Sequence, residues 1–375
     1  MRKLRNILNF WHSKSMFGML IGLIFLSIGF AGCSDDDDTI AYLNNGGDDD
    51  SSLESLLDGA YSLFTISNEG YNQENDVDFD GEGGLTSVII YDSNGDTGDF
   101  SGTYAIDTNG ETTIDDTDSA GIVSADGGSL SLVDTALSGG VDTELMIGFA
   151  IKQASTASLD ASDLNGDYVF CQIRYEQDAT YAASSYFNFT FNGDNTWSGE
   201  ITYDSDDSTG ASISGGYTIS ADGEITATLE GMTKVLTGRV SEDTNIIALI
   251  DEEDPNDEEV LIMIGLKKTS DADNTLLSGD YQMVTFGIEE DKSSFWSSQI
   301  DLDVDGDGGI EADIFADSND DTGNASILYT VDADGEMTLS TGEYGIVSSD
   351  GEMFIIVDTG EGDTDVLLGI GIKKS

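Results

Sequence analysis

Histidine is almost absent from this chain: its only histidine, His12, lies near the N-terminus, ahead of every acidic residue. The rest of the chain therefore cannot build Ser-His or Cys-His nucleophiles or histidine-ligated metal centres. Proline is equally scarce, with one residue against 45 glycines. Few prolines and many glycines suit long β-ladders joined by tight turns.

Basic residues are scarce as well, at 13 against 74 acidic residues. Four of them (Arg2, Lys3, Arg5 and Lys14) precede residue 33, and every acidic residue follows it. The chain from residue 33 onward therefore has nine basic residues against 74 acidic ones, a charge of −65. Such a charge argues against nucleic acid or an anionic lipid surface as a partner, and it favours cations or basic surfaces.

The N-terminal segment has the form of an export signal. The basic stretch is followed by the 15-residue apolar run Met16–Phe30, which is shorter than the ~20 residues of a membrane span. The run leads into Phe30-Ala31-Gly32-Cys33, which resembles the lipobox of bacterial lipoproteins, although that family usually has leucine where Phe30 stands. The resemblance implies cleavage before Cys33 and its acylation, including palmitate, as a membrane anchor. The alternative is an uncleaved N-terminal anchor helix.

An acidic stretch follows Cys33, beginning Ser34-Asp35-Asp36-Asp37-Asp38. Residues 33–52 are too polar to bury a core, so we interpret them as a flexible tether after a signal peptide at 1–32. An acidic run at this place also resembles the surface-export signal of lipoproteins in the Bacteroidota; a plain spacer is the alternative. The expected location is the cell envelope, at the outer membrane and exposed on the surface. Once Cys33 is acylated, Cys171 is the only thiol, and we expect it to be a small buried hydrophobe.

One short pattern, Leu-x-Gly-x-Tyr, occurs three times, at Leu57–Tyr61, Leu164–Tyr168 and Leu277–Tyr281. Its glycines are 107 and 113 residues apart, and each copy ends in a glycine-rich apolar strand followed by lysine. Units of this length can bury their own cores. The sequence therefore predicts three tandem modules, at residues 53–155, 156–270 and 271–375.

Each module alternates short apolar strands with acidic, glycine-containing turns. In Gln299–Val304, for example, apolar and polar residues alternate, and Asp305-Gly306 then favours a hairpin turn. About eight such strands per module predict an all-β antiparallel meander, and closure into a barrel is favoured because it removes exposed edges. The opening pattern is similar to the Gly-x-Trp opening of lipocalin-like barrels, with Tyr in place of Trp. A two-sheet sandwich, or a six-bladed propeller with two blades per module, are the alternatives.

Two strands, Met353–Val357 and Ile246–Ile250, are apolar on both faces. Strands of this kind are covered on both sides. We therefore expect adjacent modules to pack through these strands; a sandwich core is the alternative. A solvent-exposed outer face at Phe354 and Ile356 would count against packing between modules.

An acidic loop in each module places oxygen-bearing side chains at alternate positions. Ca²⁺ prefers six to eight oxygen ligands, of which such a loop supplies three, but the glycine and glutamate of an EF-hand are missing. Plain polar turns are the alternative interpretation. The candidate ligands are Asp92, Asn94, Asp96, Asp204, Asp206, Asp317, Asn319 and Asp321.

The favoured function is non-catalytic: an envelope lipoprotein with a binding or structural role, in which calcium is the one cofactor considered. A lipocalin-like carrier of a small apolar ligand is the first alternative, and a cavity lined by residues such as Tyr329 and Ile327 would favour it. A hydrolase acting through paired carboxylates is the second alternative, although no pair stands out among so many acids.

Overall fold

The computed structural model describes residues 53–114, 119–134, 145–154, 158–176, 181–205, 209–230, 234–252, 259–289, 294–318, 322–358 and 365–375. The predicted signal peptide, the predicted acylation site Cys33 and the predicted acidic tether lie outside these ranges. No helix within them is long and apolar enough to cross a membrane.

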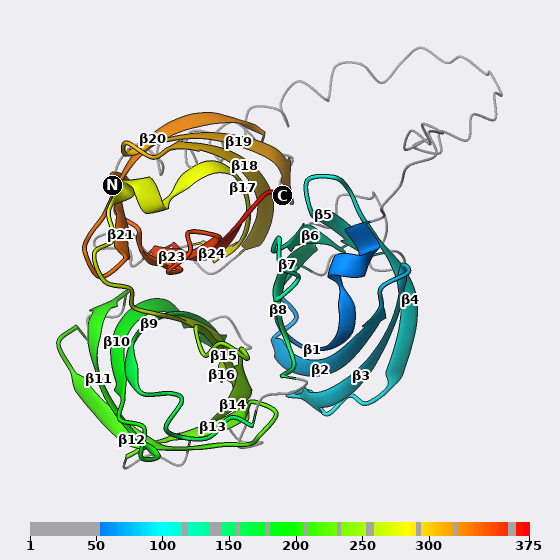
Figure 1. Cartoon of the computed structure of the whole chain (residues 1–375), viewed down its shortest axis with the longest axis vertical. Coiled ribbons are helices and arrows are strands. Elements are labelled where there is room, and N and C mark those ends of the chain that lie inside the picture. The colour runs from blue at the N-terminus through cyan, green and yellow to red at the C-terminus, as the bar shows by residue number, and fades with distance from the viewer. Residues whose placement is uncertain are drawn as a thin grey trace, which may run out of the picture. The chain divides into compact units, whose positions relative to one another are not determined.

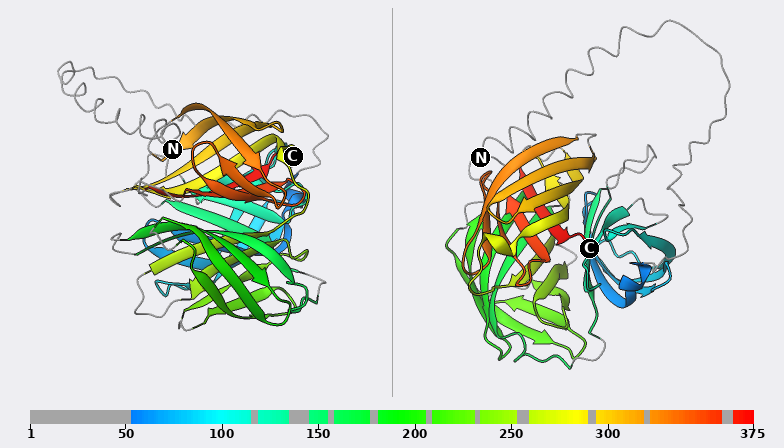
Figure 2. Two further views of the ribbon diagram at one scale, coloured as in Figure 1. Left: turned by 90° about the vertical axis from the view of Figure 1, so that its left-hand side faces the viewer. Right: turned by 45° about the horizontal axis from the view of Figure 1, so that its top comes forward.

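The described chain forms three closed barrels, each of eight antiparallel strands (Figure 1). In every barrel the strands pair in chain order, and the last strand returns to pair with the first. The predicted barrel meander is therefore confirmed, and the sandwich and propeller alternatives are wrong. Two further views show the strands of the barrels from other directions (Figure 2).

Barrel 1 follows the short 3₁₀ helix η1 (Leu53–Leu56). Its strands are β1 (Asp58–Ser67), β2 (Tyr71–Asp80), β3 (Gly84–Asp92), β4 (Asp99–Ile106), β5 (Glu111–Ile114), β6 (Ser119–Val123), β7 (Ser129–Asp134) and β8 (Met146–Lys152).

Barrel 2 has the strands β9 (Gly166–Glu176), β10 (Ala182–Phe191), β11 (Thr196–Asp204), β12 (Ser212–Ile219), β13 (Glu224–Leu229), β14 (Val235–Val240), β15 (Ile246–Glu252) and β16 (Glu259–Lys267).

Barrel 3 follows the 3₁₀ helix η2 (Asn274–Leu276). Its strands are β17 (Ser278–Ile288), β18 (Phe295–Asp305), β19 (Gly309–Asp317), β20 (Gly323–Val331), β21 (Glu336–Leu339), β22 (Tyr344–Val347), β23 (Met353–Asp358) and β24 (Val366–Lys373).

The repeated opener closes one end of each barrel. Gly59, Gly166 and Gly279 all have positive φ, between 102° and 142°, which glycine tolerates and other residues rarely adopt. The tyrosine two residues on then donates its hydroxyl to a backbone carbonyl of the β6–β7 turn or its equivalent: Tyr61 to Gly127, Tyr168 to Thr244 and Tyr281 to Gly351. The ammonium of the lysine that ends the barrel lies 5.6–5.9 Å from the same ring, within cation–π range.

The three barrels share one apolar core outside their own interiors. Successive side chains of a strand point to opposite faces, so a doubly apolar strand can serve two cores. On β23, Met353, Ile355 and Val357 belong to a buried cluster with residues of all three barrels. The expected packing of modules through this strand is therefore confirmed. The sequence analysis places Phe354 and Ile356 on the outer face, and this is wrong: they point into barrel 3, where Phe354 contacts the Tyr281 ring.

The hydrogen bonds between barrels follow a cyclic order. Asn72, Ser184 and Ser297 occupy the same position near the start of the second strand of their barrels. Asn72 donates to the carbonyls of Asp251 and Leu261 in barrel 2, at 3.2 Å each, and Ser184 donates to the carbonyl of Asp358 in barrel 3. Ser297 donates to the carbonyl of Asp134 in barrel 1 at 2.8 Å. Barrel 1 contacts barrel 2, 2 contacts 3 and 3 contacts 1, as in a closed three-membered ring.

Ion pairs reinforce this cycle at two of its three junctions. Lys268, just after β16, pairs with Glu336 of barrel 3, and Lys374, just after β24, pairs with Glu111 of barrel 1 at 2.7 Å. The equivalent residue after β8 is Gln153, which is uncharged. At that junction the buried Arg239 of barrel 2 donates to the Ser62 hydroxyl of barrel 1 at 2.9 Å and lies 3.7 Å from Glu224.

Cys171 is fully buried, as predicted. It belongs to the core shared by the barrels. Burial raises the pKa of its thiol well above the usual range, so the thiolate is disfavoured.

Candidate functional site

Two of the predicted calcium ligands, Asp92 and Asp204, accept hydrogen bonds from their own loop or from the neighbouring strand. Asp92 Oδ1 accepts the backbone N–H groups of Asn94 and Asp96, at 2.7 and 3.2 Å, and its Oδ2 accepts from Gln73 Nε2 at 2.8 Å. Asp204 accepts from the Ser185 hydroxyl at 3.0 Å, and Asp317 is buried. Asp206, Asn319 and Asp321 lie outside the described residues. Calcium binding therefore stays a prediction.

The serine after each of these first acids explains why the Asp-Ser pair occurs three times. Ser93 exchanges two hydrogen bonds with the backbone of Asn72, and Ser205 and Ser318 do the same with Ser184 and Ser297. This pairing fixes the strand residue that bonds to the next barrel. The repeated Asp-Ser pair thus has a structural reason that sequence reasoning missed.

A cavity of about 600 Å³ lies where three equivalent turns meet, one from each barrel. In each turn the first serine hydroxyl donates to the aspartate two residues later: Ser124 to Asp126, Ser241 to Asp243 and Ser348 to Asp350. Each of these carboxylates therefore accepts a hydrogen bond within its own turn. Within the described ranges, no group of three or more acidic or cysteine side chains is arranged to hold a metal ion.

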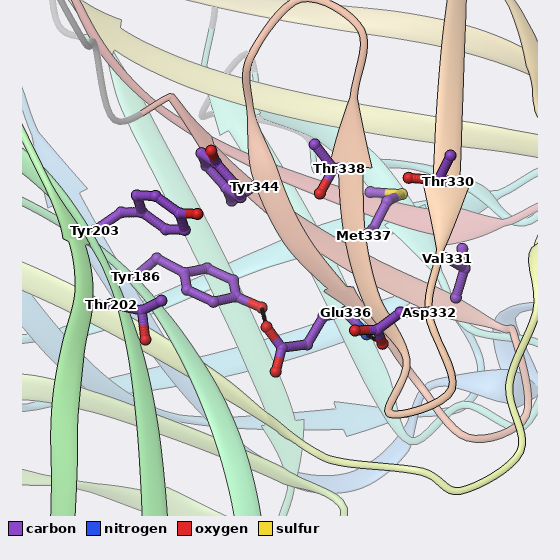
Figure 3. Close-up of a pocket in the computed structure, with 10 residues that line it drawn as sticks. All are labelled: Tyr186, Thr202, Tyr203, Thr330, Val331, Asp332, Glu336, Met337, Thr338 and Tyr344. Carbon is purple, nitrogen blue, oxygen red and sulfur yellow. Dashed lines mark hydrogen bonds between the residues drawn. The ribbon is translucent and has the colours of Figure 1, made fainter.

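A second pocket, of about 240 Å³, lies between β10 and β11 of barrel 2 and β20–β22 of barrel 3 (Figure 3). The Tyr186 hydroxyl donates to Glu336 Oε2 at 2.8 Å, and the rings of Tyr203 and Tyr344 stack with centroids 3.7 Å apart. Burial and the nearby Glu336 charge raise the pKa of Tyr186 well above its usual range. Because these groups are paired with one another across the junction, we interpret this pocket as part of the contact between the barrels.

The interior of barrel 1 contains a cavity of about 290 Å³. This volume is near the lower end of the ~300–1,000 Å³ typical of ligand sites. The exposed Asp99 and Phe100 lie at its edge, and Thr65, Gln73 and Asn75 add polar groups to its wall. Most of the remaining wall is apolar: Leu63, Val77, Phe79, Leu85, Leu130 and Leu132.

Barrel 2 fills the corresponding space with aromatic rings. Its interior cluster includes Phe170, Phe187, Phe189 and Trp197, where barrel 1 has Leu63, Asn75, Val77 and Leu85. Phe189 fits because Gly199 stands opposite: a Cβ at Gly199 would lie 2.2 Å from the Phe189 ring. Barrel 1 has the smaller Val77 and the larger Ser87 at this pair.

Tyr329 and Ile327, which the sequence analysis names as residues whose cavity would favour a carrier, belong to barrel 3 and do not line this cavity. Tyr329 is committed to closing the end of barrel 3, because its hydroxyl donates to the carbonyls of Asn274 and Leu277 at 2.9 and 2.8 Å. Burial raises its pKa to about 12, so it remains a donor. The signal for barrel 1 was present in the sequence, since small or polar residues stand there at positions that are aromatic in barrel 2.

Comparisons with known proteins give only weak likenesses to solved structures. No protein-family model matches the chain, and no curated protein matches it. Among solved structures, a mutant transferrin binding protein B from Haemophilus parasuis is 12% identical, with a TM-score of 0.29, over 81% of this chain and 65% of that one. Isotype 1 transferrin binding protein B from serogroup B Neisseria meningitidis is 11% identical, with a TM-score of 0.29, over 82% of this chain and 66% of that one.

A DUF3598-family protein of unknown function from Nostoc punctiforme is 12% identical, with a TM-score of 0.23, over 57% of this chain and 99% of that one. The chain spans less than two thirds of the length of either transferrin binding protein. Likenesses of this strength carry no argument about function. The class that the coordinates define is a chain of three closed eight-stranded antiparallel barrels.

Proposed function

We propose that this chain is a non-catalytic binding protein of the bacterial cell envelope, which carries a small apolar ligand inside barrel 1. The observation that carries the proposal is the barrel 1 cavity of about 290 Å³, set beside the aromatic filling of barrel 2. An interior left unfilled loses contacts that a packed one keeps, so retaining it favours a ligand that supplies them.

The envelope location rests on the lipobox-like Phe30-Ala31-Gly32-Cys33 and the acidic tether. Metabolic labelling with radioactive palmitate is expected to mark the wild-type protein and to leave Cys33→Ser unlabelled. If Cys33→Ser keeps the label, the acyl chain is attached at another residue. If neither the wild type nor the variant is labelled, the proposed lipid anchor is wrong.

The carrier function is tested by calorimetric titration of the purified protein with 1-octanol. Val77→Phe with Ser87→Gly copies the Phe189–Gly199 pair of barrel 2 into the cavity, and it is expected to weaken binding at least tenfold. The matched control, Leu302→Phe with Ala312→Gly, makes the same change at the equivalent pair in barrel 3 and should leave binding unchanged. Equal binding by both variants, or no binding by the wild type, would contradict a barrel 1 carrier.

A further inference from the structure

Two buried polar side chains in the barrel 1 cavity have unused hydrogen-bonding capacity. Thr65 is 2% exposed, and its hydroxyl has no hydrogen-bond partner among the described residues. Asn75 is 6% exposed, and within the described chain the only bond of its amide is the one from Nδ2 to Gln73 Oε1, at 2.8 Å. Buried polar groups are normally paired, so each such exception calls for a physical explanation.

The unpaired hydroxyl is peculiar to barrel 1. Thr285 occupies the same position in barrel 3, opposite Ser298 on the neighbouring strand, and the two hydroxyls bond at 2.5 Å. In barrel 1 the residue opposite Thr65 is Gln73, whose amide turns away to Asp92. The same fold can therefore satisfy this hydroxyl from within, and barrel 1 does not.

The direction of the polar groups follows from Asp92. Its carboxylate can only accept, so Gln73 must point its NH₂ toward Asp92 and its Oε1 toward Asn75. Asn75 must then donate its Nδ2 to Gln73 Oε1, which leaves Asn75 Oδ1 without a donor among the described residues. We call the hydrogen-bonded series Asp92–Gln73–Asn75 the relay; Asn75 Oδ1 is its free end. The relay therefore presents an acceptor, beside a threonine hydroxyl, to whatever fills the cavity.

The charges around the cavity are negative. Asp92 stands behind the relay, and the exposed Asp99 lies at the cavity edge. No lysine or arginine lines the cavity within the described chain. A carboxylate head group entering this barrel would meet like charge, whereas a hydroxyl or an ammonium would not.

We infer that the cavity selects a small amphiphile with an apolar body and a head group that donates a hydrogen bond, an alcohol or an amine, and discriminates against carboxylates. The inference rests on the proposed carrier function. The apolar body replaces the contacts missing from the barrel interior, and the head group satisfies Asn75 Oδ1 and the Thr65 hydroxyl.

The test compares four straight-chain amphiphiles by calorimetric titration of the purified protein near pH 7.5: 1-octanol, octylamine, octyl methyl ether and octanoate. The two donors are expected to bind at least tenfold more tightly than octanoate. Octanol should bind about fivefold more tightly than the ether, which has the same chain but no donor. Equal binding of all four, or tightest binding of octanoate, would overturn the inference and leave the carrier function standing. Binding of none would overturn the carrier function itself.

A pair of variants separates recognition from stability. Thr65→Val should weaken octanol binding about fivefold and leave stability unchanged or higher, because it removes an unpaired hydroxyl. Thr285→Val, the matched change in barrel 3, should lower stability by orphaning Ser298 and leave octanol binding unchanged. If both variants lower stability and neither changes binding, Thr65 is not part of a ligand site.

Discussion

Barrels 1 and 2 share a strand order and a register and differ in what they enclose. Their opening tyrosines and end-closing lysines correspond residue by residue. Inside, Leu85 and Trp197 stand at equivalent positions, each opposite a glycine, Gly102 or Gly215. The backbone therefore tolerates either a filled or an open interior, and side-chain size at a few inward positions decides between them.

The same two barrels also differ at the core they share. Ile122 of barrel 1 and Ile346 of barrel 3 are fully buried at one position, pairing with Glu111 and Glu336 on the neighbouring strand. Barrel 2 has Arg239 there, paired with Glu224. The residue after β8 is Gln153, whereas Lys268 and Lys374 follow β16 and β24. Arg239 of barrel 2 therefore supplies the cation that Glu336 and Glu111 receive from the preceding barrel. A cation close to this glutamate is thus supplied at two different positions: by a lysine after the last strand of the preceding barrel, or by Arg239 within barrel 2.

The largest effect is expected from emptying barrel 2. Trp197→Ala should lower the free energy of unfolding by about 3–5 kcal/mol, because the fixed strands around it cannot collapse into the space. Leu85→Ala, the matched change in barrel 1, should cost about 2 kcal/mol, near the low end for leucine, since that side chain already borders a cavity. Denaturant unfolding of both variants measures the difference. Equal losses would mean that the two interiors are equally packed.

The next largest effect is expected at the junction of barrels 1 and 2, where Arg239 takes the place of a lysine after the last strand. Arg239→Ala should cost about 3 kcal/mol, because it removes a buried side chain together with its bonds to the Ser62 hydroxyl and the Asp222 carbonyl. Arg239→Ile with Gln153→Lys rebuilds the arrangement of the other two junctions and should recover most of this loss. Gln153→Lys alone is the control. A double variant no more stable than Arg239→Ala would show that the junctions are not interchangeable.

Barrel 3 has a third kind of interior, with a buried acid. Glu343 is 3% exposed and stands where barrel 2 has the interior Leu236. Burial raises the pKa of this carboxyl from its ordinary value of 4.5 to about 7. Below pH 4.5 the carboxyl is neutral in both states, and between pH 4.5 and 7 the unfolded chain ionises first, so stability falls as pH rises by up to about 3 kcal/mol.

Glu343→Gln is expected to remove this slope and to be more stable than wild type at pH 8. Denaturant unfolding between pH 4 and 8 measures it. Asp303→Asn, at an exposed position on β18, is the matched control and should leave the slope in place. A slope that survives in Glu343→Gln would assign the pH dependence to other acids.

The fold was predictable because its signals are local. The alternation in Gln299–Val304 and the Asp305-Gly306 turn predict the β18–β19 hairpin, and Gly306 has the positive φ of 74° that such a turn needs. Doubly apolar β23 likewise predicted contact between modules. The assignment of Phe354 and Ile356 to the outer face was wrong. The interior of barrel 3 and the core shared by the barrels are both apolar, so the composition of β23 does not distinguish its two faces.

The site was less predictable because it depends on differences between copies. The repetition of the acidic loops predicts a calcium site, yet Asp92 and Ser93 form hydrogen bonds that fix a strand and a junction between barrels. The cavity arises where a pattern fails to repeat, at Asn75 and Ser87. Residues that bond across the chain, such as Arg239 with Ser62, leave no local pattern at all.

The smallest expected effect concerns the predicted binding of calcium by the acidic loop of each barrel. If Asp92, Asn94 and Asp96 and their counterparts bind Ca²⁺, calcium at ten times its dissociation constant should stabilise the protein by about 1.4 kcal/mol per site. Asp96→Asn, at an exposed position, should remove the calcium-dependent stabilisation contributed by the barrel 1 loop. Thermal unfolding with calcium, magnesium or chelator at fixed ionic strength measures this. An equal shift with magnesium would reflect screening of the −65 charge and return these loops to the structural role that the Asp92 hydrogen bonds already support.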